Sequence, residues 1–164
     1  MSTDRVAAFR QSMKLDYEKW HEGIGYDVSL FETATQQELA EMERQVLATG
    51  VDDWRDIEAL NALATPTAKA RIREMLANGP LKMRMAVLSH APALVTDAER
   101  EAVLIAVLGE LDFYEGLTQA LSIIEDFHPP PIIDALFRET LRRDGGAACR
   151  FSASKSSWCS FAAI

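Results

Sequence analysis

Helix starts recur at a nearly constant interval along the middle of this sequence. They lie at Thr65, Thr96 and Pro129, about thirty-one and thirty-three residues apart, which is within the range of helical repeats. A shorter helical segment precedes each start, at 54–63, 81–88 and 113–124. Because a pair of short amphipathic helices cannot bury its apolar face alone, such pairs stack on their neighbours. The interval therefore predicts an all-α fold of packed helix pairs.

The residues at the expected helix ends support this interpretation. TQQE at 35–38 and TDAE at 96–99 are capping boxes, in which Thr and Glu satisfy free backbone N–H groups of the first turn. Thr65 and Pro66 suit the N-cap and the first helical position. The expected stops are glycines and prolines, at Gly50, 78–80, Pro92, Gly109, 129–131 and Gly145-Gly146. No stretch shows the sustained two-residue alternation of a β-strand.

Superposing the second helices of the three pairs places apolar residues at matching positions. Ile72, Val103 and Leu136 align with one another. The next matching set is Leu76, Val107 and Thr140. The last helix carries a longer stripe, formed by Ile132, Ile133, Leu136, Phe137, Thr140 and Leu141. We expect these stripes to face the core.

Three stretches within 53–143 resemble HEAT-like and armadillo-like α-solenoids. They read EALNALATPTAKARIREML, AVLSHAPALVTDAEREAVLIAVL and ALSIIEDFHPPPIIDALFRETL. The resemblance implies a short right-handed α-solenoid-like stack of antiparallel helix pairs, with a concave binding face and no built-in chemistry. Since the units are shorter than the usual forty-odd residues of that family, we expect a compact stack rather than a long superhelix.

The expected organisation is one all-α domain over 1–164. A chain of this length buries enough surface to fold without a disulfide or a structural metal. Residues 1–34 form an N-terminal helix and loop cap, and 35–143 hold the helical pairs. Residues 144–164 are Ser-rich with three aromatic side chains, so they form either a C-terminal cap or a frayed tail.

The charge of the chain restricts its partners. A net charge of -8 and a pI near 4.9 disfavour nucleic acid and anionic membranes, and they favour encounter with a basic protein. The simpler interpretation is that the acidic surface maintains solubility. The N-terminus has no secretory signal, and the longest apolar run, Ala102 to Leu108, is too short to span a bilayer. Two late cysteines, Cys149 and Cys159, form no disulfide framework, so we expect a cytoplasmic location.

The first candidate site is the segment DYEKWHEGIGYD. It combines Tyr17, His21, Glu22, Tyr26 and Asp27. A histidine among carboxylates is a feature of metal and acid–base sites, but this segment has one histidine and no HExxH spacing. Aromatic side chains interleaved with charges fit a protein contact surface better. The alternative is a solvated helix end whose aromatic residues pack onto the helices.

The second candidate site is the tetrad Asp53, Trp54, Arg55 and Asp56. One interpretation is an exposed Trp–Arg anchor for a protein partner. In the other, Trp54 belongs to the core, Asp53 caps the helix and Arg55 pairs with a neighbouring carboxylate. The helical stripe through Trp54 favours the second.

The sequence therefore favours a non-enzymatic protein-binding module. It has no Gly-rich phosphate loop, no GxSxG motif and no readable Cys–His pair, so we expect no catalytic residues, no metal and no cofactor. Short acidic helical stacks look like bacterial interaction proteins, including immunity proteins that neutralise a toxic effector. The alternatives are a homodimeric accessory subunit and, third, an enzyme that uses the His21 cluster.

Overall fold

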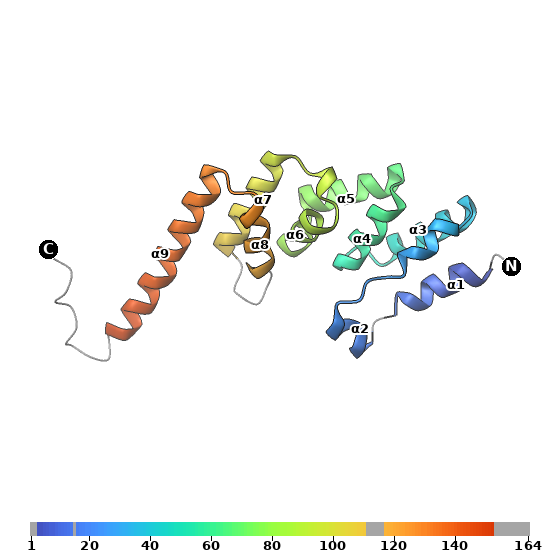
Figure 1. Ribbon diagram of the computed structural model, residues 1–164, viewed down its shortest axis with the longest axis horizontal. Coiled ribbons are helices and arrows are strands. Elements are labelled where there is room, and N and C mark those ends of the chain that lie inside the picture. Colours follow the sequence, from blue (N-terminus) through green and yellow to red (C-terminus); the bar gives the residue numbers. More distant parts are fainter. Residues whose placement is uncertain (1–2, 15, 111–116, 153–164) are drawn as a thin grey trace. The chain divides into compact units, whose positions relative to one another are not determined.

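Every regular element that the structure describes is helical. The computed structural model describes residues 3–14, 16–110 and 117–152. Its helices are α1 (Thr3–Ser12), α2 (Tyr17–Glu22), η1 (Val28–Thr33), α3 (Gln36–Ala48), α4 (Trp54–Leu63), α5 (Pro66–Asn78), α6 (Leu81–His90), η2 (Pro92–Leu94), α7 (Asp97–Glu110), α8 (Thr118–Asp126) and α9 (Pro130–Ser152) (Figure 1). The all-α class is confirmed. Contacts divide the chain into two compact units, residues 1–103 and 104–164, and each is described by itself.

The helix starts lie where the capping residues predict them. The Thr35 hydroxyl accepts a hydrogen bond from the Glu38 N–H at 3.3 Å, and the Glu38 carboxylate accepts the Thr35 N–H at 2.7 Å. The Thr65 hydroxyl accepts the N–H of Ala68 at 3.0 Å. These bonds satisfy N–H groups that have no partner within the first helical turn. Local side-chain chemistry thus fixes where α3 and α5 begin.

The predicted helix ends are only partly correct. Gly50 ends its helix with a φ of +89°, and a Cβ on Gly79 would lie 2.5 Å from the Met75 carbonyl oxygen. However, α7 continues through Gly109 to Glu110, and α9 continues through Gly145-Gly146 to Ser152. A glycine inside a helix costs about 1 kcal/mol relative to alanine but keeps its N–H, so it weakens a helix without ending it.

These differences change the expected C-terminal region. Its first part, 144–152, continues α9. Residues 153–164 lie outside the described part of the chain, and so do 113–116 of the helix expected over 113–127.

Unit 1 is built around α4. This helix packs against α3, α5, α6 and η1, and α5 also packs against α6, so neighbouring helices contact one another as expected (Figure 1). The inward positions of these helices are fully buried and apolar: Met42, Val46, Ile57, Leu60, Ile72, Met83 and Val87. Their 3.6-residue periodicity is the reason that each helix presents one apolar side to its neighbours.

Unit 2 buries a different part of its last helix from the one predicted. The aligned residues Ile72 and Val103 are buried in unit 1, as expected. Among the α9 side chains that the structure describes, Ile132 and Ala135 are buried, whereas Ile133, Phe137, Thr140 and Leu141 are exposed. The prediction that the whole stripe faces the core is therefore wrong for these four residues.

An ion pair fastens the start of α7 to α5. Arg73 donates to both carboxylate oxygens of Glu99, at 2.8 and 2.7 Å, and to the Leu94 carbonyl at 2.9 Å. Its hydrogen bonds to Glu99 are the main reason that the pKa of this carboxyl falls from 4.5 to about 2, and bonds from Thr96 add to the shift.

We expect Arg73→Gln to destabilise the protein slightly and only while Glu99 is ionised. A carboxyl whose pKa is lowered in the folded state adds stability above its unfolded pKa, and this stability is lost as the pH falls through the folded pKa. Because both side chains are partly exposed, the difference from the native chain should be below about 1 kcal/mol at pH 7 and vanish near pH 2. Urea unfolding at both pH values measures it, and a difference that persists at pH 2 contradicts it.

Candidate binding surface

The short helix α2 is held at both ends. The Asp16 side chain caps its start by accepting the Lys19 N–H at 2.9 Å, and Gly23 ends it with a φ of +63°. The Lys19 ammonium donates to the carbonyls of Ser12 at 3.2 Å and Lys14 at 2.9 Å. These carbonyls lie at the end of α1 and just after it, where a cation is favoured. The lysine therefore ties α2 to the end of α1.

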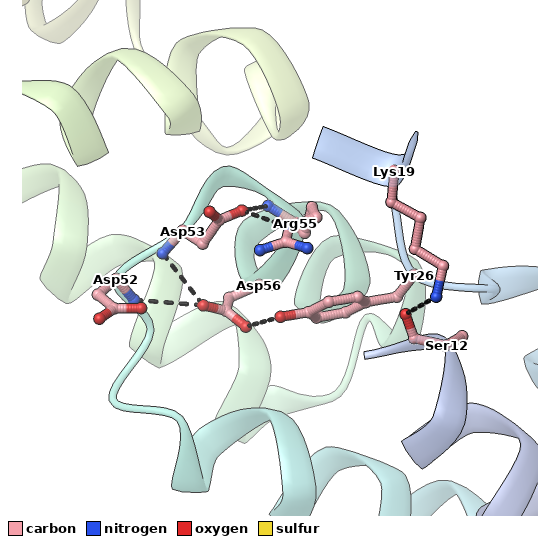
Figure 2. A network of polar contacts seen from close by, with 7 residues as sticks. All are labelled: Ser12, Lys19, Tyr26, Asp52, Asp53, Arg55 and Asp56. Carbon is pink, nitrogen blue, oxygen red and sulfur yellow. Dashed lines mark hydrogen bonds and ion pairs between the residues drawn. The ribbon is translucent and has the colours of Figure 1, made fainter. Parts of the chain in front are cut away.

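Tyr26 anchors the segment after α2 inside unit 1. Its ring is buried and packs edge-on against Phe9, with ring centroids 6.0 Å apart. Its hydroxyl donates to an Asp56 carboxylate oxygen at 2.9 Å, and the Arg55 guanidinium lies 5.3 Å from the centre of its ring (Figure 2). Tyr26 thus joins the two segments that the sequence singled out separately.

Asp56 is the centre of this polar network. It is 1% exposed, and its second oxygen accepts the N–H groups of Asp52 at 3.2 Å and Asp53 at 3.1 Å (Figure 2). Burial, the largest cause, raises the pKa of Asp56 although the hydrogen bond from Tyr26 opposes the shift. Burial and the neighbouring Asp56 likewise raise the pKa of Tyr26. The network therefore connects the loop at 52–53 and the start of α4 with the N-terminal segment.

Asp53 and Arg55 have the structural roles of the second interpretation. Asp53 caps α4 by accepting the Arg55 N–H at 3.0 Å, and the Arg55 Nε donates to the same oxygen at 2.7 Å. Burial alone would raise the pKa of Asp53, but the hydrogen bonds from Arg55 outweigh it and lower the pKa. Arg55 is 7% exposed, and its Nη1 has no hydrogen-bond partner among the described residues. The interpretation of Arg55 as part of an exposed Trp–Arg anchor is therefore wrong.

Trp54 is neither core nor fully exposed. Its ring stacks on His90 at the end of α6, with centroids 5.0 Å apart and an angle of 20° between the planes. Burial lowers the pKa of His90, against a smaller opposing effect of Glu58. The stacked pair links α4 to α6 at the surface, so the predicted place of Trp54 in the core is wrong.

The remaining site residues are exposed around α2. Tyr17 is 76% exposed and stacks on His21, with centroids 5.8 Å apart. The His21 Nδ1 lies 2.9 Å from a Glu22 oxygen, and Asp27 accepts the Ser29 hydroxyl at 2.5 Å. Ile24, which no sequence pattern marks, is also exposed. We call this set the α2 surface: Tyr17, His21, Glu22, Ile24 and Asp27.

The predicted site thus splits into two layers. Tyr17, His21, Glu22 and Asp27 are accessible to a partner, and Asp53 and Trp54 are partly accessible. Tyr26, Arg55 and Asp56 are buried, and their contacts lie within unit 1. Ile24 was missed because a single apolar residue after a glycine has no periodic pattern to mark it.

The described residues contain no group of three or more His, Cys, Asp and Glu side chains placed to hold a metal ion. None of the described helices combines the length and the apolarity needed to cross a membrane. Comparison with protein-family models, with curated protein sequences and with solved structures gave no match.

Proposed function

We propose that the chain is a non-enzymatic protein-binding module that contacts its partner through the α2 surface. The observation that carries this proposal is the exposure of Tyr17. This large aromatic side chain is 76% exposed, and it lies on a helix that is fixed at both ends. Exposed aromatic residues with a polar surround are the usual anchors of protein interfaces. Ile24, exposed just beyond the end of the same helix, adds a second apolar contact.

Preorganisation supports this role. Lys19 holds α2 to the end of α1, and Tyr26 holds the following loop to α4. A surface that is rigid before binding loses little conformational entropy when it binds, so more of its contact energy contributes to affinity. The buried polar network thus has a function in recognition although it touches no partner.

The charge around Tyr17 indicates the chemistry of the partner. The exposed carboxylates near it are Asp16, Glu18, Glu22 and Asp27. They outnumber the cations of this segment, and the ammonium of Lys19 is turned onto backbone carbonyls. Complementary charge speeds association and disfavours acidic partners, so we infer a basic protein.

Catalysis is the less supported role. His21 contacts one carboxylate, Glu22, and both side chains are more than half exposed. General acid–base catalysis needs a positioned group with a pKa tuned by its surroundings, which burial and nearby charges supply. An exposed His–Glu pair lacks such burial.

The same proposal extends to the arrangement of the helix pairs and to the role of the chain in the cell. We infer that the sequential packing of α3 to α6 is part of a short right-handed HEAT-like stack of helix pairs, supported by the recurring helix starts. In the narrower form of the proposal, the chain is a cytoplasmic immunity protein that blocks a toxic bacterial effector by covering its basic cleft. The acidity of the chain and the absence of catalytic motifs in its sequence support that form.

We expect Tyr17→Ala to weaken binding of the natural partner by at least tenfold without changing the fold. Truncation of a central aromatic anchor typically removes about 2 kcal/mol or more of binding energy. In the test, the native chain and the Tyr17→Ala variant are each used to capture proteins from the source organism. A protein that the native chain captures and the variant does not is purified. The affinity of this protein for each of the two chains is then measured by calorimetry.

Two variants serve as controls for this experiment. Phe137→Ala removes another exposed aromatic residue, on α9, and Glu22→Lys reverses one charge of the α2 surface. The first should bind like the native chain, and the second should bind more weakly, with a smaller salt dependence. Equal affinity of the native chain and Tyr17→Ala for every captured protein contradicts the proposal.

A further inference from the structure

The exposed side of α9 carries an apolar ridge that the described helices of unit 2 leave uncovered. Ile133, Phe137 and Leu141 follow one another at intervals of four residues, and Phe137 and Leu141 are 67% and 72% exposed. Residues four apart form a continuous row along a helix surface. Contiguous exposed apolar surface of this kind marks an interaction site.

A hollow lies beside this ridge. Ile133, Leu136, Phe137 and Thr140 line it, and its volume is about 270 Å³. When two helices pack with their four-residue ridges interlocked, the ridge of each enters the groove beside the ridge of the other. The surface of α9 therefore holds both parts of such a contact, a ridge and an adjoining groove.

The charges next to the ridge are self-complementary. Asp134 and Arg138 are exposed, lie four residues apart and form no ion pair among the described residues. An Asp–Arg pair at this spacing often closes within one helix, but here it does not. If a second α9 runs antiparallel across the first with the two Phe137 rings at the centre, Asp134 of each copy lies about two residues, or about 3 Å along the helix axis, from the level of Arg138 of the other, which is within reach of the long arginine side chain. Both ion pairs then form between copies.

We propose that the α9 ridge binds a second copy of this chain, forming an antiparallel two-fold dimer centred on Phe137. The same residues serve both copies, as a two-fold contact requires. One helix face is smaller than the roughly 800 Å² per partner of a stable interface, so the dimer is weak and depends on concentration. The contact uses residues of unit 2 and the proposed function uses residues of unit 1, so this inference does not rest on the proposed function.

The charge pattern provides a test that uses only full-length chains. In Asp134→Arg, the new arginine of each copy lies next to Arg138 of the other copy. In Arg138→Glu, the new glutamate of each copy lies next to Asp134 of the other copy. Each variant alone should self-associate at least tenfold more weakly than the native chain. Mixed in equal amounts, they should form a heterodimer with near-native affinity, since every cross pair then joins opposite charges. A merely misfolded variant would not be rescued by mixing.

Sedimentation velocity over about 5 to 500 μM, a range suited to a micromolar Kd, measures these equilibria. Phe137→Ala should abolish association, and Tyr17→Ala, the matched change on unit 1, should leave it intact. A native chain that stays monomeric throughout overturns the proposal, and the ridge is then left to another segment of the chain or to a foreign protein. Failure of the mixed variants to associate, or single variants that associate like the native chain, also overturns it.

Discussion

Asp56→Ala is expected to lower the free energy of unfolding by about 3 kcal/mol, since a buried group that loses its partner costs about 1–3 kcal/mol. The change leaves the Tyr26 hydroxyl and the backbone N–H groups of Asp52 and Asp53 without their acceptor. The effect is smaller than the sum of these losses because burying the Asp56 charge is itself costly, as its raised pKa indicates. Urea unfolding at pH 7 measures the change.

A double-mutant cycle isolates the contact between Tyr26 and Asp56. Tyr26→Phe alone should cost about 1.5–3 kcal/mol, the range for hydrogen bonds to charged groups. In the Asp56→Ala background it should cost much less, because the acceptor is already gone. Asp52→Ala is the control, since its side chain is exposed and only its backbone donates to Asp56. Full additivity of the Tyr26 and Asp56 changes contradicts the assigned contact.

The second large effect is expected from the centre of unit 1. Leu60→Ala should lower the free energy of unfolding by about 3–4 kcal/mol, because it removes buried methyl groups and leaves a cavity. Leu60 is fully buried on α4, the helix that contacts α3, α5 and α6. Since these neighbours are themselves fixed by other contacts, the site cannot collapse completely.

Leu141→Ala is the matched control for this prediction. It is the same substitution on an α9 residue that is 72% exposed, and it should change the free energy of unfolding by less than about 0.5 kcal/mol. Thermal and urea unfolding of both variants give the comparison. Equal losses for Leu60 and Leu141 would mean that α4 is not the packing centre of unit 1.

Local chemistry explains which features the sequence could predict. The capping boxes at Thr35 and Thr96 and the proline at 66 act within one helical turn, so their residues alone specify where α3, α5 and α7 begin. The glycines were less informative. Gly50 adopts a positive φ, whereas Gly109 lies within an ordinary helix, and the residue type alone does not distinguish the two.

Contacts between segments far apart in the chain could not be predicted from the sequence. Tyr26 and Asp56 are thirty residues apart, and no periodic pattern relates them. On α9, the apolar pairs Ile132-Ile133 and Leu136-Phe137 lie four residues apart and Leu141 follows at the same interval, so apolar side chains cover a wide arc of the helix. Successive residues differ by about 100° around the axis, and only packing decides that Ile132 is buried and Ile133 is exposed.

The most direct test of the account is a photo-crosslinking amino acid placed at Tyr17 in the source organism. Because Tyr17 is proposed to lie at the centre of the interface, irradiation should join the chain to one basic protein. The same amino acid at Ala98, an exposed residue of α7, should not give that product. Identical products from both positions, or no protein product from Tyr17, would contradict the claim that this chain acts by binding a partner through the α2 surface.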